Sequence, residues 1–385
     1  MNVVEPRYKF DQNEAMPARL VKVWDLPVRL FHWLLVASIT VASITGWLLP
    51  VSWLQIHLIA GTLIGCLVLW RMVWGFTGTR YSRFRSFVFS PAATISHVKD
   101  LVEGRAPREA GHNPLGALMV FAFLGSISII VLTGVAVLGG QLKQGPLKAF
   151  VSFASAMNYR DIHSVVAIVL LVLIGGHLAG VIFESWRTRE NLATAMVTGS
   201  KRDGFEHEAP MARVRIGAAL SVSTLLAVLV VAGAYALTGL SPLGAAALPK
   251  NTTWEHECSS CHMAFHPSLL PAKSWVAIMS GLSQHFGEDA SLDAAASKEI
   301  TDYLVSHSAE TWDSQAANRL RNVDPARPLE ITATRFWTRT HHDISPAIFL
   351  SKAVGAKQNC SACHQDAASG MFAPQSISIP QENTQ

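Results

Sequence analysis

Ile162-His163-Ser164 opens an apolar run that reaches Ile174-Gly175-Gly176-His177-Leu178 near its far end. This run, residues 162–183, is long and apolar enough to cross a bilayer as one helix. His163 and His177 are 14 residues apart. That separation is about 21 Å along a helix axis at 1.5 Å per residue, and it is close to four turns. One helix therefore presents two imidazoles on the same face, one near each membrane surface.

The composition of the whole chain agrees with a membrane protein. Of the 385 residues only 15% are charged and 50% are hydrophobic, which is too apolar for an ordinary soluble protein. The length suits a membrane domain plus one soluble domain, and the net charge of +4 gives no sign of nucleic-acid binding. Five apolar segments of about 20 residues or more are predicted to span the membrane. They are residues 30–49, 54–74, 114–138, 162–183 and 216–237.

The basic residues predict the orientation of these five spans. Lys and Arg gather before the first span, between the second and third, and after the fourth, whereas the intervening loops hold few. The positive-inside rule then places the N-terminus in the cytoplasm and everything after about residue 238 outside, in the periplasm of a Gram-negative bacterium. Arg19 and Arg213 belong to this pattern. Residues 1–28 lack the apolar core and cleavage site of a signal peptide, so the first span is expected to direct insertion.

The orientation can be compared with the positions of the intramembrane histidines. His32 lies near the cytoplasmic start of the first span, at the level of His177, and His57 lies near the outer start of the second, at the level of His163. Four histidines at two depths form two pairs, as two stacked haem b groups with two imidazole ligands each require. The alternative is structural histidines bonded to carbonyl groups, but ionisable groups in membranes are rare and usually functional.

After a linker at residues 240–250 the composition becomes that of a soluble domain, and two identical motifs follow. They are Cys258-Ser-Ser-Cys261-His262 and Cys360-Ser-Ala-Cys363-His364. In such motifs the two thiols add to haem vinyl groups and the histidine becomes an axial ligand of the iron. The alternatives are a zinc site built from the two cysteine pairs, or a disulfide within each pair. We therefore predict two covalently attached haem c groups on the outer side.

Spacing alone does not choose the second axial ligand of each haem c. Segments 275–286 and 292–306 have helical periodicity, and His285 ends the first of them. His341 and His342 precede the second motif by about twenty residues, near enough to close a loop over that haem. Other side chains remain open as alternatives: His256, His266, His307, Met263, Met279 and Met371.

Residues 20–205 resemble the bacterial and nickel-iron-hydrogenase type cytochrome b family, within the cytochrome b-561 superfamily. The motifs that carry the resemblance are Val23-Trp-Asp-Leu-Pro-Val-Arg-Leu-Phe-His32-Trp, His57, Arg71-Met-Val-Trp-Gly-Phe, Tyr81-Ser-Arg-Phe, Gly111-His-Asn-Pro-Leu-Gly-Ala117, His163, His177 and Glu190-Asn-Leu. The resemblance implies a four-helix bundle with two haem b groups, held by His32 with His177 and by His57 with His163. The fifth span is outside the usual pattern of this family. We interpret it as the segment that tethers the C-terminal domain to the membrane part.

Residues 250–385 resemble the dihaem cytochrome c family. The matching stretches are Glu257-Cys-Ser-Ser-Cys-His262, Leu270-Pro-Ala-Lys-Ser-Trp275, His285-Phe-Gly-Glu-Asp-Ala-Ser291, Arg339-Thr-His341, Asn359-Cys-Ser-Ala-Cys-His364 and Ile377-Ser-Ile-Pro380. The resemblance implies His285 and His341 as the distal ligands, with His342 next to the second choice. We thus expect an all-α protein of three parts, residues 1–205, 206–249 and 250–385.

These observations predict an electron-transfer protein of the bacterial inner membrane. Electrons would pass from membrane quinol through two haem b and two haem c groups to a soluble periplasmic acceptor, such as a small c-type cytochrome. His112 and Asn113 are quinone-site candidates at the inner level, although Asn113 before Pro114 also fits a helix cap. The alternatives are electron entry from a periplasmic dehydrogenase or hydrogenase, or a haem-based gas binder. A dimer or a larger complex remains open.

Overall fold

The computed structural model describes residues 20–202 and 215–380. Its described part is all-α apart from a two-stranded ribbon, in which β1 (Leu20–Lys22) pairs antiparallel with β2 (Ser200–Arg202). Arg19 and Arg213, which helped to predict the orientation, lie outside the described residues, as does most of the N-terminal segment that lacks the features of a signal peptide.

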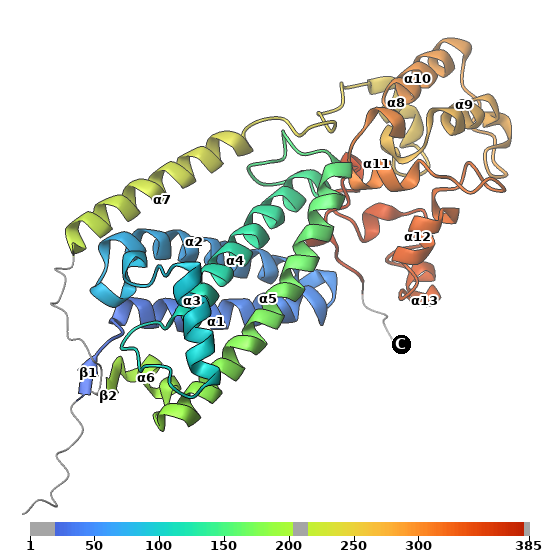
Figure 1. The fold of residues 1–385 in the computed structure, drawn as a ribbon. Coiled ribbons are helices and arrows are strands. Elements are labelled where there is room, and N and C mark those ends of the chain that lie inside the picture. The colour runs from blue at the N-terminus through green and yellow to red at the C-terminus, as the bar shows by residue number, and fades with distance from the viewer. Residues whose placement is uncertain (1–19, 203–214, 381–385) are drawn as a thin grey trace, which may run out of the picture. The chain divides into compact units, whose positions relative to one another are not determined.

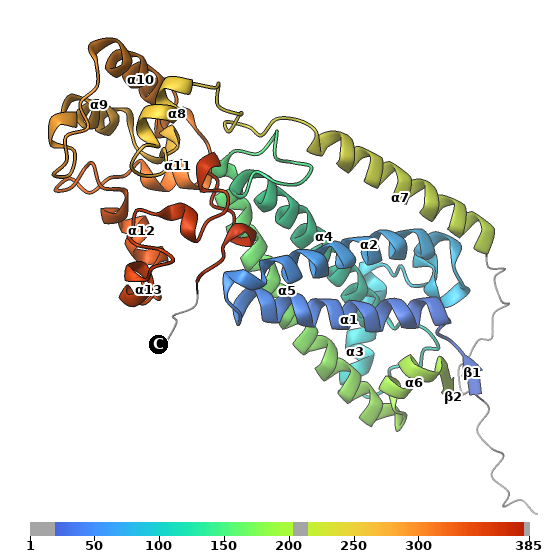
Figure 2. The same cartoon turned by 180° about the vertical axis from the view of Figure 1, so that it is seen from behind.

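Five long helices correspond to the five predicted spans. They are α1 (Leu26–Trp47), α2 (Leu54–Thr77), α4 (Pro114–Gln141), α5 (Phe153–Thr188) and α7 (Ile216–Thr238). Each is long and apolar enough to cross a membrane. Helix α5 begins nine residues before the predicted start at Ile162. The prediction began too late because the first turns of the helix carry the polar residues Asn158, Arg160 and Asp161, so they are not part of the apolar run. Helices α1, α2, α4 and α5 are gathered together in both views (Figures 1 and 2).

The described chain forms two compact units that each combine several segments. The first contains residues up to 36, 67–125 and 170–223. It includes α3 (Pro91–Val102), α6 (Leu192–Thr198), and the short 3-10 helices Arg80–Ser82 and Phe84–Ser86. Phe84, Phe87, Ala117 and Leu124 form one apolar cluster in this unit. Val28, Trp74 and Ala219 form another, which attaches the start of α7.

The second unit contains residues 37–66, 126–169 and 224 onward. Beyond α7 it consists of short helices joined by turns: α8 (Thr252–Cys258), α9 (Ala272–Ser280), α10 (Ala294–Ser306), α11 (Gln315–Leu320), α12 (Arg335–Thr340) and α13 (Pro346–Leu350). Eight 3-10 turns also belong to this unit, at residues 51–53, 267–269, 282–284, 309–311, 331–333, 360–362, 367–369 and 374–376. Trp254, Leu270, Trp275, Ile300 and Leu304 form its main core.

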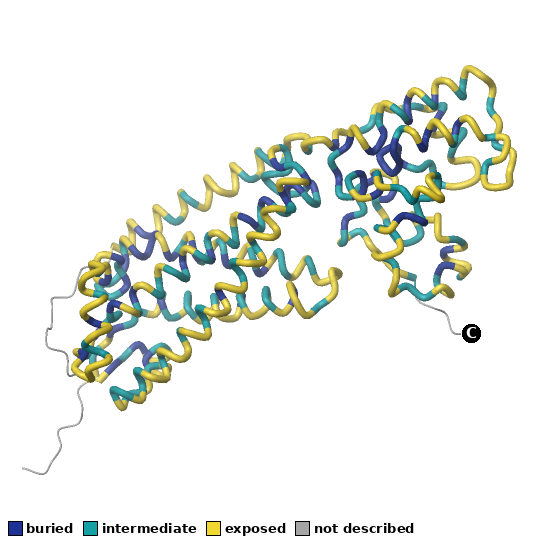
Figure 3. The backbone as a smooth tube through the Cα atoms, turned by 45° about the vertical axis from the view of Figure 1, so that its right-hand side comes forward, coloured by how far each residue is buried: buried dark blue, intermediate teal, exposed yellow. Residues whose placement is uncertain are grey.

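Burial differs sharply between the membrane helices and the small C-terminal helices (Figure 3). Helix α7 is exposed along most of its length, with Leu225, Val231 and Tyr235 all exposed. Such an apolar surface is stable against lipid rather than water. Leu269 and Ile300, in contrast, are almost fully buried.

The helix predicted over 275–286 is shorter than expected. Helix α9 ends at Ser280, and a 3-10 turn at Leu282–Gln284 follows. The chain then takes left-handed backbone angles at Phe286 (φ 50°) and Gly287 (φ 98°), so a helix cannot continue through this region. The segment predicted over 292–306 forms α10, which begins at Ala294 after its Asp293 cap. The predicted part boundaries at residues 205 and 249 remain predictions.

Candidate metal centres

His57 from α2 and His163 from α5 face each other, with their ring centroids 6.3 Å apart. A metal–imidazole bond of about 2 Å, with about 1 Å from each nitrogen to its ring centre, separates two ligand rings by about 6 Å. The spacing of these two rings therefore fits one iron atom between them. Both histidines belong to the second unit.

Each of these rings is held from behind by one neighbouring helix in the same way. The Nδ1–H of His57 donates to the carbonyl oxygen of Ala42 across 3.0 Å, and Thr45 Oγ1 lies 3.4 Å from the same nitrogen. The Nδ1–H of His163 donates to the carbonyl oxygen of Ile130 across 3.0 Å, with Thr133 Oγ1 at 3.2 Å. A carbonyl oxygen only accepts, so the proton is on Nδ1 and Nε2 is left to bind a metal.

A glycine follows each threonine and makes room for the histidine ring. A Cβ atom on Gly46 would lie 3.1 Å from Cε1 of His57, and one on Gly134 would lie 3.3 Å from Cε1 of His163. Either distance is tighter than an ordinary van der Waals contact. The repeated Thr-Gly pairs at 45–46 and 133–134 are thus a further sequence signal for this site, which the depths of the histidines alone do not reveal.

The second pair of intramembrane histidines belongs to the first unit. His32 from α1 and His177 from α5 interact electrostatically. His177 meets the edge of the Phe123 ring at a centroid distance of 5.7 Å. Nδ1 of His32 is buried, and among the described residues it has no hydrogen-bond partner. The pairing of His32 with His177 stays a prediction, and their rings have fewer supporting contacts than those of His57 and His163.

The histidines of the two Cys-x-x-Cys-His motifs each face one further histidine. The ring centroids of His262 and His285 are 6.1 Å apart, and those of His364 and His341 are 6.0 Å apart. Both separations again fit two imidazoles on one metal. Burial lowers the pKa of His285 and of His364, and a positive charge on the facing histidine would lower each further. Low pKa values favour neutral imidazole, which is the form that binds iron.

The four thiols of the motifs are free cysteines, as is Cys66 in the membrane part. Burial raises the pKa of Cys258 and that of Cys360 to about 11, so both thiols stay protonated at neutral pH. Within the described residues, no three His, Cys, Asp or Glu side chains gather into a metal-ion site.

His341 and His342 differ clearly in their surroundings. His341 stacks on Trp337 with the ring centroids 4.4 Å apart, and its Nδ1–H donates to the carbonyl oxygen of Trp337 across 2.8 Å. His342 is exposed, and its Nε2 lies 3.0 Å from a carboxylate oxygen of Asp343. Of the two, His341 is therefore the one whose ring faces the motif histidine His364.

The remaining histidine candidates of the C-terminal region have other contacts. His256 is exposed beside Glu257. His307 donates through Nδ1 to the carbonyl oxygen of Tyr303 across 2.9 Å. His266 is 2% exposed, its Nδ1 lies 2.8 Å from Ser268 Oγ, and its ring meets the Trp312 ring at 4.5 Å. These contacts assign the three histidines to local packing and surface pairing. Met263, Met279 and Met371 stay as the open alternatives.

The two quinone-site candidates occupy different settings in the first unit. Asn113 caps α4, because its side-chain oxygen accepts from the backbone N–H of Gly116 across 2.7 Å. The ring of His112 lies between those of Trp24 (4.8 Å) and Phe87 (4.6 Å), and its buried Nδ1 has no partner among the described residues. Burial, and then the charges of Arg71, Lys201 and His177, lower the pKa of His112 to about 3.

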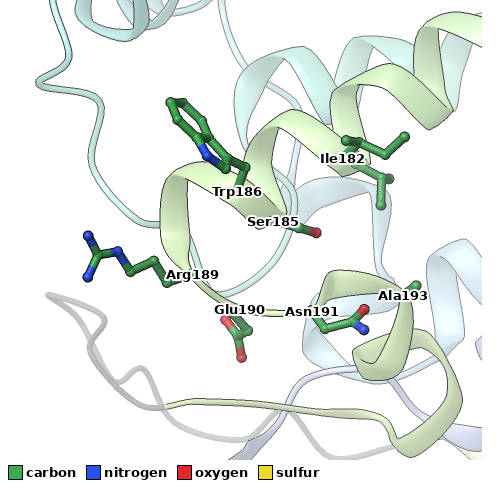
Figure 4. Close-up of a pocket in the computed structure, with 8 residues that line it drawn as sticks. Ile182, Ser185, Trp186, Arg189, Glu190, Asn191 and Ala193 are labelled. Carbon is green, nitrogen blue, oxygen red and sulfur yellow. The ribbon is translucent and has the colours of Figure 1, made fainter.

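A groove of about 460 Å³ follows the end of α5, starting at Val181, four residues after His177. Figure 4 shows the side chains of Ser185 and Asn191 pointing to one side of the groove, whereas Trp186 and Arg189 point away from them. Ile182 and Trp186 are exposed. Ser185 Oγ accepts from the backbone of Leu192, and Asn191 caps α6. The groove is therefore open and apolar at its rim. The side chains of Ser185 and Asn191 already accept hydrogen bonds from the backbone.

Comparison with known proteins assigns both parts of the chain. The family model for prokaryotic cytochrome b561 matches residues 23–199, and that for dihaem cytochrome c matches residues 254–372. A Bradyrhizobium diazoefficiens protein named probable Ni/Fe-hydrogenase B-type cytochrome subunit is 25% identical over 47% of this chain and 86% of its own length. A protein of Escherichia coli K12 named probable Ni/Fe-hydrogenase 1 B-type cytochrome subunit is 24% identical over 48% of this chain and 91% of its own length.

Solved structures match the C-terminal part. The dihaem cytochrome c of Shewanella baltica is 36% identical and covers 34% of this chain and 95% of its own (TM-score 0.28). That of Rhodobacter sphaeroides is 39% identical and covers 33% of this chain and 100% of its own (TM-score 0.29). The chain thus contains an N-terminal cytochrome b561 domain of the Ni/Fe-hydrogenase B type and a C-terminal dihaem cytochrome c domain.

Proposed function

We propose that this membrane electron-transfer cytochrome carries electrons from quinol in the bilayer to a soluble acceptor in the periplasm. Two haem b and two covalently attached haem c groups would form the path. The observation that carries the proposal is the series of histidine pairs, at 6.3 Å in the membrane helices and at 6.1 and 6.0 Å in the C-terminal helices. A haem supplies one-electron chemistry when bound, and the protein sets its potential through ligands, burial and hydrogen bonds.

The proposed ligands are His57 with His163 and His32 with His177 for haem b, and the two C-terminal pairs for haem c. Cys258, Cys261, Cys360 and Cys363 would provide the covalent links. The backbone carbonyls of Ala42 and Ile130 fix the tautomers of the outer pair and keep Nε2 free for the iron. Two histidines on one haem iron would leave no open position for a gas, which favours electron transfer.

Quinol oxidation also needs hydrogen-bonding groups beside a haem and access from the lipid. We place this site at the inner level, beside His112. Its buried Nδ1 lacks a partner among the described residues, and its low pKa keeps the ring neutral. A neutral ring can accept a hydrogen bond from a quinol hydroxyl group through the nitrogen that carries no proton. Asn113 is the weaker of the two candidates, since its side chain caps α4.

The orientation proposed here has the N-terminus in the cytoplasm. It is supported by Lys22 and Arg29 before α1, by seven basic residues from Arg71 to Arg108, and by the basic residues that follow α5. In this orientation the dihaem cytochrome c domain lies on the side where haem c is attached. The acceptor would then be a soluble periplasmic protein, such as a small c-type cytochrome.

The reverse direction is the second candidate, and one observation favours it. The curated relatives from Bradyrhizobium diazoefficiens and Escherichia coli are named as hydrogenase B-type cytochrome subunits. A chain of this type could instead receive electrons from a periplasmic dehydrogenase or hydrogenase, within a larger complex, and reduce quinone. The haem content is the same in both directions, so the order of the haem potentials decides between them.

Anaerobic mixing of the purified protein with a short-chain quinol tests the proposal. We expect rapid appearance of both b-type and c-type bands in the visible difference spectrum, and their suppression in a His112→Ala variant. A matched His97→Ala variant, in which a buried histidine of α3 is changed, should keep the wild-type rate. Reduction by dithionite but not by quinol would contradict the proposed entry point and favour a periplasmic donor.

A further inference from the structure

Arg71 occupies a position in α2 that matches the position of His177 in α5. It follows His57 by 14 residues, the same interval that separates His163 from His177. Fourteen residues is close to four helical turns, so Arg71 leaves the same face of α2 as His57. Its residue is only 4% exposed. A buried arginine therefore points inward at the level of the inner histidine pair.

The guanidinium group of Arg71 has one carboxylate in its electrostatic surroundings, and part of the group has no hydrogen-bond partner among the described residues. Its carbon lies 4.9 Å from the centre of the Phe84 ring, and its Nη1 is buried without a hydrogen-bond partner among the described residues. Asp25 is the carboxylate that interacts with it electrostatically. The oxygens of Asp25 already accept from four other donors: the Val28 N–H (2.8 Å), Trp74 Nε1 (3.1 Å), Thr79 Oγ1 (2.6 Å) and Ser82 Oγ (2.8 Å).

Two further ionisable side chains belong to the same surroundings, a neutral histidine and a lysine whose ammonium group is already engaged. His112 interacts electrostatically with Arg71, Lys201 and His177, so Arg71 and His177 share this neighbour. Nζ of Lys201 donates to the carbonyl oxygen of Ala110 across 3.0 Å. A buried guanidinium N–H calls for an acceptor, and an anionic oxygen gives the strongest hydrogen bond. The first unit therefore presents a buried guanidinium group whose Nη1 lacks an acceptor among the described residues.

We propose that Arg71 binds a propionate carboxylate of the inner haem b through Nη1. This inference rests on the proposed function, because it requires that His32 and His177 hold a haem. Carboxylate and phosphate oxygens share the chemistry that Arg71 recognises, so the phosphate of an anionic phospholipid is the other possible source. Haem properties and bound phosphorus, measured on the same variants, distinguish the two sources.

The test compares Arg71→Gln, Arg71→Lys and a matched Arg85→Gln variant in the full-length protein. Arg85 is exposed and stands one residue after Phe84, so its loss removes the same charge without touching the buried site. Haem b per haem c is measured from pyridine haemochrome spectra, both b-type midpoint potentials are measured by mediated redox titration, and phospholipid phosphorus is measured per protein.

We expect Arg71→Gln to lower the midpoint potential of one b-type haem, or to remove that haem while the other remains. The cause is that an uncompensated propionate charge stabilises the ferric form. Arg71→Lys keeps the charge, so its haem content and midpoint potentials should be close to those of wild type. Arg85→Gln should have the same haem content and midpoint potentials as wild type. Unchanged potentials and haem content in Arg71→Gln would overturn the inference, and so would loss of bound phosphorus with unchanged haem. Because mediators replace quinol in the titration, a failure of quinol oxidation would not be mistaken for either result.

Discussion

His57 and His163 face each other with ring centroids 6.3 Å apart, and each is held by a carbonyl group, a threonine and a glycine of an adjacent helix. The two supports come from different helices, α1 and α4, but use the same residue order. In each helix the carbonyl oxygen belongs to the residue three positions before the threonine, and the glycine follows the threonine directly. This repetition fixes the same tautomer in both rings and leaves Nε2 of each ring free.

Gly46→Ala should therefore disturb the outer haem b alone. The added Cβ would lie 3.1 Å from Cε1 of His57, which forces the ring or the helix to move. Changes behind a metal ligand typically weaken metal binding by about 10- to 100-fold. We expect a loss of about half of the haem b and unchanged haem c, measured from pyridine haemochrome spectra.

Gly134→Ala should have the same effect, since its Cβ would approach His163 at 3.3 Å. Gly233→Ala in α7 is the control, because nothing lies within 4 Å of its Cβ position. If Gly233→Ala lost as much haem b as the other two, the effect would reflect membrane insertion rather than the ring support.

The sequence predicts the membrane part well because each span is one long apolar run. It also pairs the intramembrane histidines, since helix periodicity and depth together fix which residues share a face and a level. The supports of the rings are harder to predict. Thr45 and Thr133 are ordinary helix residues until the packing of neighbouring helices brings them within 3.4 Å and 3.2 Å of a histidine nitrogen.

In the C-terminal part the sequence predicts some of the site residues and leaves others open. Its motifs reveal the proximal histidines, but the second histidine of each pair comes from irregular chain. Spacing cannot choose between His341 and His342, because a one-residue change in such a turn reverses the direction of a side chain. Packing against Trp337 decides the direction in the structure. The unfavourable setting of Arg71 was also invisible in the sequence, where the residue reads as one more cytoplasmic basic residue.

His177→Ala should remove the inner haem b and leave both haem c groups attached. His177 is the proposed partner of His32, and loss of one axial imidazole weakens the site without affecting covalent attachment elsewhere. Haem stoichiometry of the purified variant, with His97→Ala as the matched control, measures the outcome. Two haem b groups per chain in His177→Ala would show that the proposed ligand pairing is wrong.

His341→Ala and His342→Ala should differ although the residues are adjacent. His341 faces His364 at 6.0 Å, whereas His342 is exposed and paired with Asp343. We expect His341→Ala to convert one haem c to a five-coordinate form that binds carbon monoxide after reduction, and His342→Ala to remain six-coordinate. Visible and resonance Raman spectra distinguish the two forms. Carbon monoxide binding by His342→Ala alone would reverse the assignment.

The stability of the C-terminal domain should fall as the pH drops from about 6.5 toward 4. Burial, and then the charge of His307, lower the pKa of His266 to about 4, whereas the unfolded chain restores the ordinary value of 6.5. Between pH 6.5 and pH 4 the unfolded state therefore binds more protons than the folded state. The free energy of unfolding falls by roughly 3 kcal/mol over this pH range.

Thermal unfolding followed at the c-type Soret band between pH 7 and pH 4.5 measures this loss. His266→Gln keeps a polar side chain beside Ser268 but does not titrate in this range. The variant should therefore lose less stability than wild type over the same interval. Parallel curves for the two proteins would assign the acid sensitivity to another group.

Lys143 and Asp313 form an ion pair within the second unit that should be critical for stability. Nζ of Lys143 donates to Oδ2 of Asp313 across 2.7 Å, and the side chain of Lys143 is fully buried. The same carboxylate oxygen accepts from the backbone N–H of Phe153 at the start of α5, across 2.8 Å. Asp313→Ala would leave the buried Lys143 cation with only the Val151 carbonyl oxygen as an acceptor, and the Phe153 N–H without its acceptor. Removal of one partner of a buried pair costs about 3–5 kcal/mol, and the lower end applies because Asp313 is partly exposed.

The expected result is a lower unfolding temperature for Asp313→Ala in detergent, measured by scanning calorimetry. The matched control is Asp302→Ala, which breaks the exposed pair with Lys298 and should leave stability unchanged. The double variant Lys143→Met with Asp313→Ala should recover much of the loss, since it removes the uncompensated cation together with its partner. If the double variant were no more stable than Asp313→Ala alone, the lost capping of α5 rather than the buried charge would explain the effect.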